Sequence, residues 1–274
     1  MKKFLNLLAA TALVTTSAST VVSCSSTANW KTFKGWIDKQ DSFILYIGAR
    51  DCEYCQQFET AKDIVSSEPG NSLEDRITSL QNEYNNLTIV GNTQTDDLTG
   101  FGQALKSDLR FETFMIDEKA NNFREKWSKN ILDWAVDQVT NIYIDYRWGS
   151  TPGGDLIDTT VKENIAKKVA KNAFYKNGDK TSPNVGTPFF LVVRNGKLVT
   201  WTTDGYSEST ETNDKLVEFD NWFNAIREDF KNPDIKSSIM SKLEDYSPDA
   251  STSESKTNFN YDQIDFNNYT NWNK

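Results

Sequence analysis

Apolar residues along this chain occur in two patterns, as short continuous runs and as stripes with helical spacing. The run FILYI at 43–47 is short and β-prone, which favours a buried parallel strand. Residues 48–51 (GARD) are predicted to form a turn. From Cys52 onward the spacing is helical until Glu68-Pro69-Gly70 ends the helix, and its core-facing side contains Cys55, Phe58 and Ile64.

The same succession appears in the second half of the chain. Pro188 stands directly before the apolar run FFLVV at 189–193, where it marks the start of a strand because Pro cannot donate inside a ladder. Arg194-Asn195-Gly196-Lys197 is a hairpin turn of the Asn-Gly type, so residues 198–202 are predicted to return as the partner strand. A helix is expected over 214–230, with an apolar stripe of Leu216, Phe219, Phe223, Ile226 and Phe230.

One more strand is expected between these two halves. We assign it to NIYIDY at 141–146, with Thr88-Ile89-Val90 as the competing candidate. Residues 67–120 then form a largely helical insertion after the first helix. A helix is predicted at 72–86 of this insertion, followed by a loop rich in Thr, Asp and Gly over 91–102.

Two further helices are predicted after the insertion. Gly153-Gly154 is expected to begin one that continues to about Tyr175. The other covers residues 121–139, whose apolar side chains indicate core packing rather than an aromatic binding site. Its stripe consists of Phe123, Trp127, Ile131, Trp134, Ala135 and Val139.

The N-terminal residues have the pattern of an export signal. Lys2 and Lys3 precede an apolar stretch from Phe4 to Val14, which is shorter than the roughly 20 residues of a membrane span. The sequence Val21-Val22-Ser23-Cys24 resembles a lipobox, so the segment is similar to the signals of bacterial lipoproteins, including those of wall-less bacteria. This resemblance implies removal of residues 1–23, a lipid on Cys24 and anchoring on the extracytoplasmic face of the cell membrane. A signal anchor and an ordinary secretory peptide remain as alternatives.

The mature chain divides into three predicted parts. Residues 24–40 form a linker with a short helix, 41–230 form the folded domain, and 231–274 form a polar, mostly disordered tail. Without Lys2 and Lys3, 28 basic residues are set against 39 acidic ones, a net charge of −11. Nucleic acid and anionic lipid headgroups are therefore not expected as partners.

The chain has three cysteines and no histidine, and this composition limits its chemistry. If Cys24 carries lipid, the remaining two are the Cys-x-x-Cys pair Cys52 and Cys55. A closed zinc site needs four ligands, usually Cys and His, so no metal site and no cofactor are predicted. A disulfide across so small a loop adds little stability. A redox dithiol and two small core residues remain as interpretations.

The position of the pair favours the redox interpretation. Cys52 begins a helix directly after a strand, where free amide groups and the helix dipole stabilise a thiolate. We therefore expect Cys52 to be exposed and Cys55, one turn further in, to be shielded. We expect Asp51 and Glu53 to raise the pKa of the Cys52 thiol by repulsion, and Arg50 and the helix start to lower it.

The motifs YIGARDCEYCQQFE and GTPFFLVVRNGKLV, in this order, resemble the thioredoxin-like proteins of Gram-positive bacteria related to bacteriocin transport accessory proteins. The resemblance implies an α/β thioredoxin-like fold, a mixed sheet flanked by helices. It also implies a cis Pro188 against the dithiol and a Thr187 that offers backbone groups to a substrate. The chain departs from the family at Asp51, where an aromatic is usual, at Glu53-Tyr54 between the cysteines, and at Tyr46, where many members have a buried acid.

Two functions follow as hypotheses. The first is a membrane-anchored thiol–disulfide oxidoreductase, with a preference for reduction or isomerisation, in which Cys52 attacks and Cys55 resolves. Its partners would be exported proteins with cysteines or disulfides and an unknown redox partner. The second is a surface binding lipoprotein on the same scaffold with a non-catalytic dithiol.

Overall fold

The computed structural model describes most of the chain after residue 26. Residues 1–23, predicted as an export signal, lie outside the described residues, as do Cys24, Gly153-Gly154 and the last part of the predicted tail. The described ranges are 27–67, 70–89, 95–149, 157–203 and 212–244.

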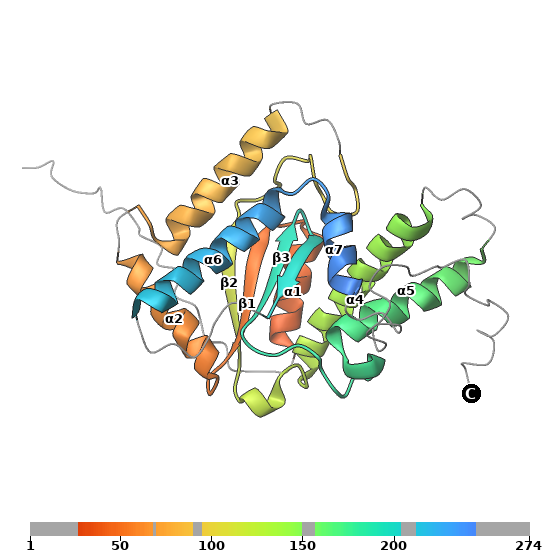
Figure 1. Cartoon of the computed structure of the whole chain (residues 1–274), viewed down its shortest axis with the longest axis horizontal. Coiled ribbons are helices and arrows are strands. Elements are labelled where there is room, and N and C mark those ends of the chain that lie inside the picture. Colours follow the sequence, from red (N-terminus) through yellow and green to blue (C-terminus); the bar gives the residue numbers. More distant parts are fainter. Residues whose placement is uncertain (1–26, 68–69, 90–94, 150–156, 204–211, 245–274) are drawn as a thin grey trace, which may run out of the picture.

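Within these ranges, four strands form one mixed sheet in the order β2-β1-β3-β4 (Figure 1). The central strand β1 pairs in parallel with β2 and antiparallel with β3, and β3 pairs antiparallel with β4. Every residue of β1 is buried, as expected for a central strand covered on both faces. The strands are β1 (Phe43–Ala49), β2 (Arg110–Ile116), β3 (Phe189–Arg194) and β4 (Lys197–Thr202).

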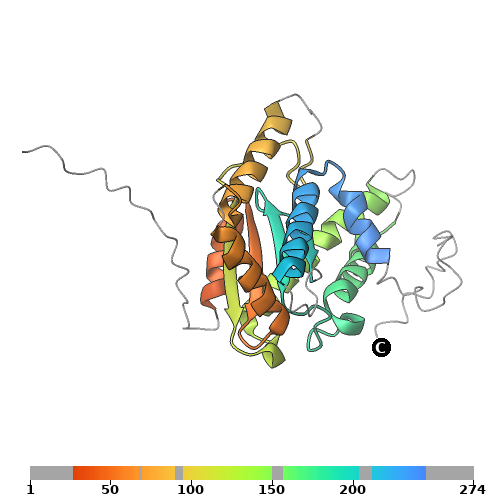
Figure 2. The ribbon, with the colours of Figure 1, turned by 60° about the vertical axis from the view of Figure 1, so that its left-hand side comes forward.

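Helices cover both faces of the sheet, which makes the fold α/β. The faces are identified by aromatic contacts: the ring of Tyr46 in β1 packs against Phe58 of α2, whereas the ring of Phe43 packs against Phe33 of α1. Helix α3 projects past the end of the sheet in both ribbon views (Figures 1 and 2). The helices are α1 (Ala28–Asp38), α2 (Glu53–Ser66), α3 (Leu73–Ile89), η1 (Lys119–Asn121), α4 (Lys126–Trp148), α5 (Thr159–Phe174), η3 (Lys176–Gly178), α6 (Thr212–Lys231) and α7 (Ile235–Glu244).

The predictions for the strand at 43–47, the helices at 52–67, 72–86 and 214–230, and the hairpin at 189–202 are confirmed. The run at 43–47 lies in β1, and the helix predicted from Cys52 is α2. The turn of the β3–β4 hairpin has Asn195 at φ 50° and Gly196 at φ 74°, the left-handed conformation that explains the Asn-Gly pair. The helices predicted at 72–86 and 214–230 are α3 and α6.

The strand predicted at 141–146 is wrong, because these residues belong to α4. Ile142 and Tyr143 are buried and continue the apolar stripe of that helix at helical spacing. The competing strand at 88–90 is wrong as well, since α3 continues to Ile89. The remaining strand of the sheet is β2, which lies inside the predicted insertion, so the insertion ends before Arg110 rather than at residue 120.

The predicted disorder of the tail is wrong for residues 235–244, which form α7. Ile235, Ile239 and Leu243 recur at intervals of four and are all buried. Helix α7 contacts α4, α5 and β4, so it closes the side of the sheet next to β4 (Figure 1). The short helix expected within 24–40 is α1.

A buried arginine connects the insertion to the β3–β4 hairpin. Arg194 donates through Nε and Nη2 to the carbonyl oxygen of Thr99, at 3.3 and 3.1 Å, and through Nη1 to that of Phe230. Its guanidinium lies 5.1 Å from the ring centres of both Tyr84 and Phe101. Burial lowers the pKa of Arg194 to about 10, so it remains charged at neutral pH.

Candidate functional site

Cys52 and Cys55 lie where the first turn of α2 follows β1, at the lower end of the sheet in Figure 1. Cys52 is the N-cap of α2, with an extended backbone at φ −94° and ψ 115°. The two sulfurs are paired as a disulfide, and the two Cα atoms are 5.2 Å apart. This is the strand-to-helix position that the sequence predicted.

Backbone amides point at both sulfurs. The N–H of Cys55 donates to Sγ of Cys52 at 3.3 Å, and the N–H of Ala49 donates to Sγ of Cys55 at 3.5 Å. In the reduced protein such donors, together with the positive end of the helix dipole, stabilise a thiolate over a thiol. The complete burial of Cys52 and the nearby carbonyl oxygen of Thr187 oppose this effect, because both favour the neutral thiol.

The loop before β3 reaches the dithiol from the other half of the chain. The Thr187–Pro188 peptide bond is cis, and the carbonyl oxygen of Thr187 lies 3.2 Å from Sγ of Cys52. The fold thus brings together all four residues that the sequence proposed for the site: Cys52, Cys55, Thr187 and Pro188.

The expected exposure of Cys52 is wrong. Cys52 is 0% exposed and Cys55 2% exposed. The local pattern of a strand followed by a helix predicts the position of Cys52 at the helix N-terminus. It does not predict which other segments bury that N-terminus. Here the Thr187 carbonyl lies against the Cys52 sulfur, and a second segment is bound to Thr187 and to Asp51, the residue before Cys52.

This second segment, residues 117–123, follows β2 and is called the rim segment below. The backbone N–H of Lys119 donates to the carboxylate of Asp51, directly before Cys52. The side chains of Asn122 and Thr187 are hydrogen-bonded at 3.3 Å. Because β1 and β2 are parallel, their carboxyl ends meet at the same edge of the sheet, and loops there form the usual site of α/β proteins.

Sequence reasoning missed the rim segment because it assigned β2 to the wrong residues. A strand at 110–116 predicts that the following loop lies beside Cys52. No local signal identifies Asn122, whose role depends entirely on tertiary contact. Phe123 belongs to this segment rather than to a helix, although it is buried as predicted.

Tyr46 lies six residues before Cys52 in β1, where the resemblance implies a buried acid. Its hydroxyl is buried and has no hydrogen-bond partner within the part of the chain that the structure describes. Burial, with a smaller contribution from the charge of Glu59, raises the pKa of Tyr46. Tyr46 therefore stays protonated at neutral pH and cannot act as a general base for Cys55.

A cleft of about 830 Å³ opens beside the dithiol. Tyr54, Thr187 and Pro188 form its end nearest the cysteines, and Trp222 and Ile226 of α6 add an apolar wall. Thr200 and Thr202 of β4 contribute hydroxyl groups to the lining, and Asp229 and Lys242 contribute charged groups. Ile226 belongs to the predicted apolar stripe of this helix, but its spacing in the sequence gives no sign that the helix lies beside the dithiol.

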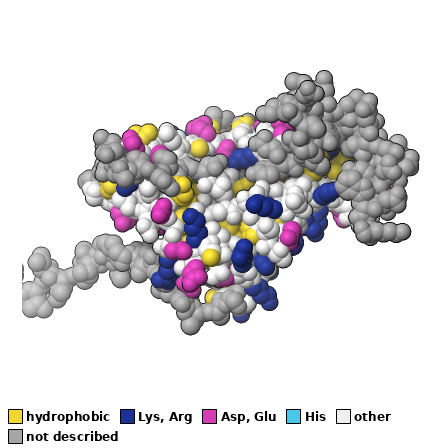
Figure 3. All heavy atoms as spheres, turned by 60° about the horizontal axis from the view of Figure 1, so that its bottom comes forward, with side chains coloured by type: hydrophobic (Ala, Val, Ile, Leu, Met, Phe, Trp, Pro, Cys, Tyr) yellow, Lys and Arg dark blue, Asp and Glu magenta, His cyan; other side chains and the backbone are white. Residues whose placement is uncertain are grey.

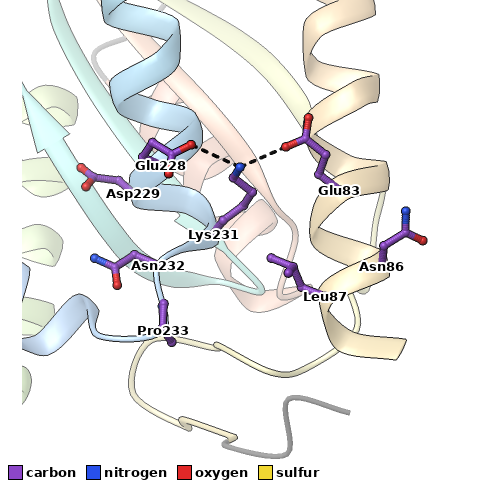
Figure 4. A pocket seen from close by; sticks show the side chains of 8 residues that line it. All are labelled: Glu83, Asn86, Leu87, Glu228, Asp229, Lys231, Asn232 and Pro233. Carbon is purple, nitrogen blue, oxygen red and sulfur yellow. Dashed lines mark hydrogen bonds and ion pairs between the residues drawn. The ribbon is translucent and has the colours of Figure 1, made fainter. Parts of the chain in front are cut away.

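A second cleft, of about 590 Å³, lies between α3 and the end of α6 (Figure 4). Glu83 forms ion pairs there with Arg227 at 2.7 Å and Lys231 at 3.1 Å. Burial alone would raise the pKa of Glu83, but the hydrogen bonds and charges of these two bases outweigh it and lower the pKa. Asp229 lines both clefts, but Cys52, Cys55, Thr187 and Pro188 do not line this one.

The described residues show neither a cluster of three or more His, Cys, Asp or Glu side chains suited to a metal ion nor a helix long and apolar enough to cross a membrane. The face of the molecule at the lower end of the sheet carries basic and acidic side chains side by side (Figure 3).

The chain matches no protein-family model, and comparisons with curated proteins and with solved structures give no significant similarity.

Proposed function

We propose that this chain is a thiol–disulfide oxidoreductase with a thioredoxin-like fold. The observation that carries the proposal is the convergence of two distant segments: the Cys52–Cys55 pair at the start of α2 and the Thr187–Pro188 loop, whose carbonyl lies 3.2 Å from the Cys52 sulfur. A mixed sheet in the order β2-β1-β3-β4, with the dithiol after β1 and Pro188 before β3, agrees with such a fold.

The chemistry is a two-step exchange. The Cys52 thiolate attacks one sulfur of a substrate disulfide, and the other substrate sulfur leaves as a thiolate that takes up a proton. Cys55, after losing its proton, attacks the Cys52 sulfur, forms the Cys52–Cys55 disulfide and releases the second substrate thiolate. The substrate gains two electrons, and a dithiol reductant must restore Cys52 and Cys55.

The cleft beside Pro188 supports a peptide as substrate. Its volume of about 830 Å³ lies within the range of ligand sites in proteins, about 300 to 1,000 Å³. A cysteine held next to Thr187 would leave its neighbouring side chain against Trp222 and Ile226. Exported proteins with cysteines or disulfides remain the proposed substrates.

Replacement of each cysteine by serine tests the catalytic proposal. Cys55→Ser keeps the attacking sulfur and removes the resolving one, so it should accumulate adducts with exported proteins that dithiothreitol releases. Cys52→Ser should give few, and wild-type protein should reduce insulin. Equal behaviour of both variants, with no insulin reduction by the wild type, would reject catalysis.

The reduction potential of the pair gives the direction of electron flow. A value near or below about −270 mV would indicate a reductase, and one near −120 mV an oxidase.

The complete burial of Cys52 favours a second candidate, a surface binding lipoprotein in which the dithiol is not catalytic. Both candidates share the proposed lipid anchor on Cys24 and the extracytoplasmic location. Cys24→Ala should leave the protein unprocessed or release it into the medium, as measured by membrane fractionation. A variant that remains in the membrane at mature size would reject the anchor.

A further inference from the structure

The rim segment, residues 117–123, connects the two halves of the dithiol site. One of its contacts, from the Lys119 N–H, is made to the residue directly before Cys52. In another, Asn122 Oδ1 accepts from the hydroxyl group of Thr187, whose carbonyl oxygen lies 3.2 Å from the Cys52 sulfur. A third is an ion pair at 3.5 Å between Asp117 and Arg50 in the turn after β1. The segment therefore holds Cys52 between groups that it binds on both sides.

The rim segment itself is weakly held. Residues 117–121 are exposed, and Phe123 is the one fully buried side chain among residues 117–123. Its regular structure is the single turn η1, with backbone bonds such as Asn121 N–H to Glu118 O at 2.9 Å. Segments with few buried apolar contacts and exposed backbone bonds open locally at low free-energy cost.

Phe123 is the anchored end of the rim segment. Its ring packs against Phe189, the first residue of β3, with ring centres 5.2 Å apart. Its φ of 52° is left-handed, which is unfavourable for a bulky residue and persists only where packing enforces it. This anchored and strained position contrasts with the exposed residues before it.

We propose that the rim segment is a hinged cover over the dithiol, anchored at Phe123, that must open before a folded protein can reach the Cys52 sulfur. The role of such a cover, the control of substrate access to Cys52, rests on the proposed oxidoreductase function. The accessibility of the Cys52 sulfur can be measured without any catalytic activity.

Two substitutions loosen the cover without changing a residue next to the cysteines. Lys119→Pro removes the N–H that Asp51 accepts. Pro is tolerated there because Lys119 is the first residue of η1 and Glu118 has the extended backbone required before Pro, at φ −133° and ψ 136°. Asn122→Ala removes the bond to Thr187. The matched control is Lys119→Ala with Asn121→Ala, which keeps both bonds.

The measurement is the alkylation rate of Cys52 in the reduced full-length chain, followed by peptide mass spectrometry. The reagent is a maleimide attached to a long poly(ethylene glycol) chain. Each lost hydrogen bond is worth about a factor of five in an equilibrium, so the double variant should react about tenfold faster or more, and the control within about twofold of wild type. Equal rates for the double variant and wild type, or an equal rise in the control, would overturn the cover.

A second measurement does not depend on any variant. In native-state hydrogen exchange, the amides of residues 119–124 should exchange much faster than those of β1, because the cover opens without unfolding the sheet. Exchange as slow as in β1 would overturn the proposal. If the cover is supported by both measurements but wild-type protein never reduces insulin, the oxidoreductase proposal fails while the cover remains.

Discussion

Strands β1 and β2 are parallel neighbours, but they differ in how completely they are buried. All seven residues of β1 are buried, whereas β2 is an edge strand in which Phe114 and Ile116 are the buried residues. The polar residues of β2 also bind each other: Arg110 donates to Glu112 at 2.8 Å. The central strand positions the dithiol, and the edge strand positions the rim segment that covers it. Core packing thus fixes the position of the dithiol, and a less buried strand fixes the position of the rim segment.

The largest difference is expected between core substitutions in the two strands. Leu45 in β1 is 0% exposed, so Leu45→Ala should lower the free energy of unfolding by about 3 kcal/mol. Met115 in β2 is only half-buried, and Met115→Ala should cost about 1 kcal/mol. Urea unfolding measures both. Equal losses of unfolding free energy would mean that side chains of β2 contribute as much to stability as those of β1, against the contrast between the two strands.

The same difference decides what the sequence could predict. The run at 43–47 has no polar interruption, and the hairpin at 194–197 has an Asn-Gly pair whose conformation few other residues adopt. In β2 the charges of Arg110 and Glu112 interrupt the apolar pattern, because the first four residues of this edge strand are only half-buried. The residues at 141–146 are β-prone, but they continue the apolar stripe of α4. Tertiary packing of this stripe outweighs their strand propensity.

The candidate site likewise contains residues that local pattern predicts and residues that it does not. Cys52, Cys55 and Pro188 each stand at the boundary of an apolar element, so local pattern was sufficient to place them. Burial of Cys52 and the contact of Asn122 depend on a loop that approaches from a third element. Such contacts have no periodicity along the chain, and no local rule predicts them.

A somewhat smaller effect is expected where the insertion meets the hairpin. Arg194→Met keeps the length of the side chain but leaves the carbonyl groups of Thr99 and Phe230 without their donors. Each buried carbonyl that loses its partner costs about 1 kcal/mol or more, so the free energy of unfolding should fall by about 2 to 3 kcal/mol. Thermal and urea unfolding measure the change.

Arg227→Met is the matched control on α6, because Arg227 is 39% exposed and pairs only at the surface with Glu83. Its cost should stay below about 1 kcal/mol. If Arg194→Met costs no more than Arg227→Met, the insertion is attached to the hairpin by apolar packing alone.

The smallest effect concerns the ion pairs that connect α3 of the insertion to α6. The folded chain holds the pKa of Glu83 below its ordinary value of 4.5. A lowered carboxyl pKa stabilises the fold above the unfolded pKa, and this stabilisation disappears as the pH falls through the folded pKa. Glu83→Gln should therefore lower the free energy of unfolding by about 0.5 to 1 kcal/mol at neutral pH, and by progressively less below about pH 4.5.

The control for this pH dependence is Glu228→Gln on α6, which removes a carboxylate from the same cleft (Figure 4). Glu228 is 75% exposed and pairs with Lys231 at 3.2 Å within one helix, so its loss should change stability by less than the loss of Glu83 at every pH. Urea unfolding at several pH values separates the two variants. A pH-independent difference between wild type and Glu83→Gln would show that Glu83 acts through packing, and that the insertion is attached to α6 without help from charge.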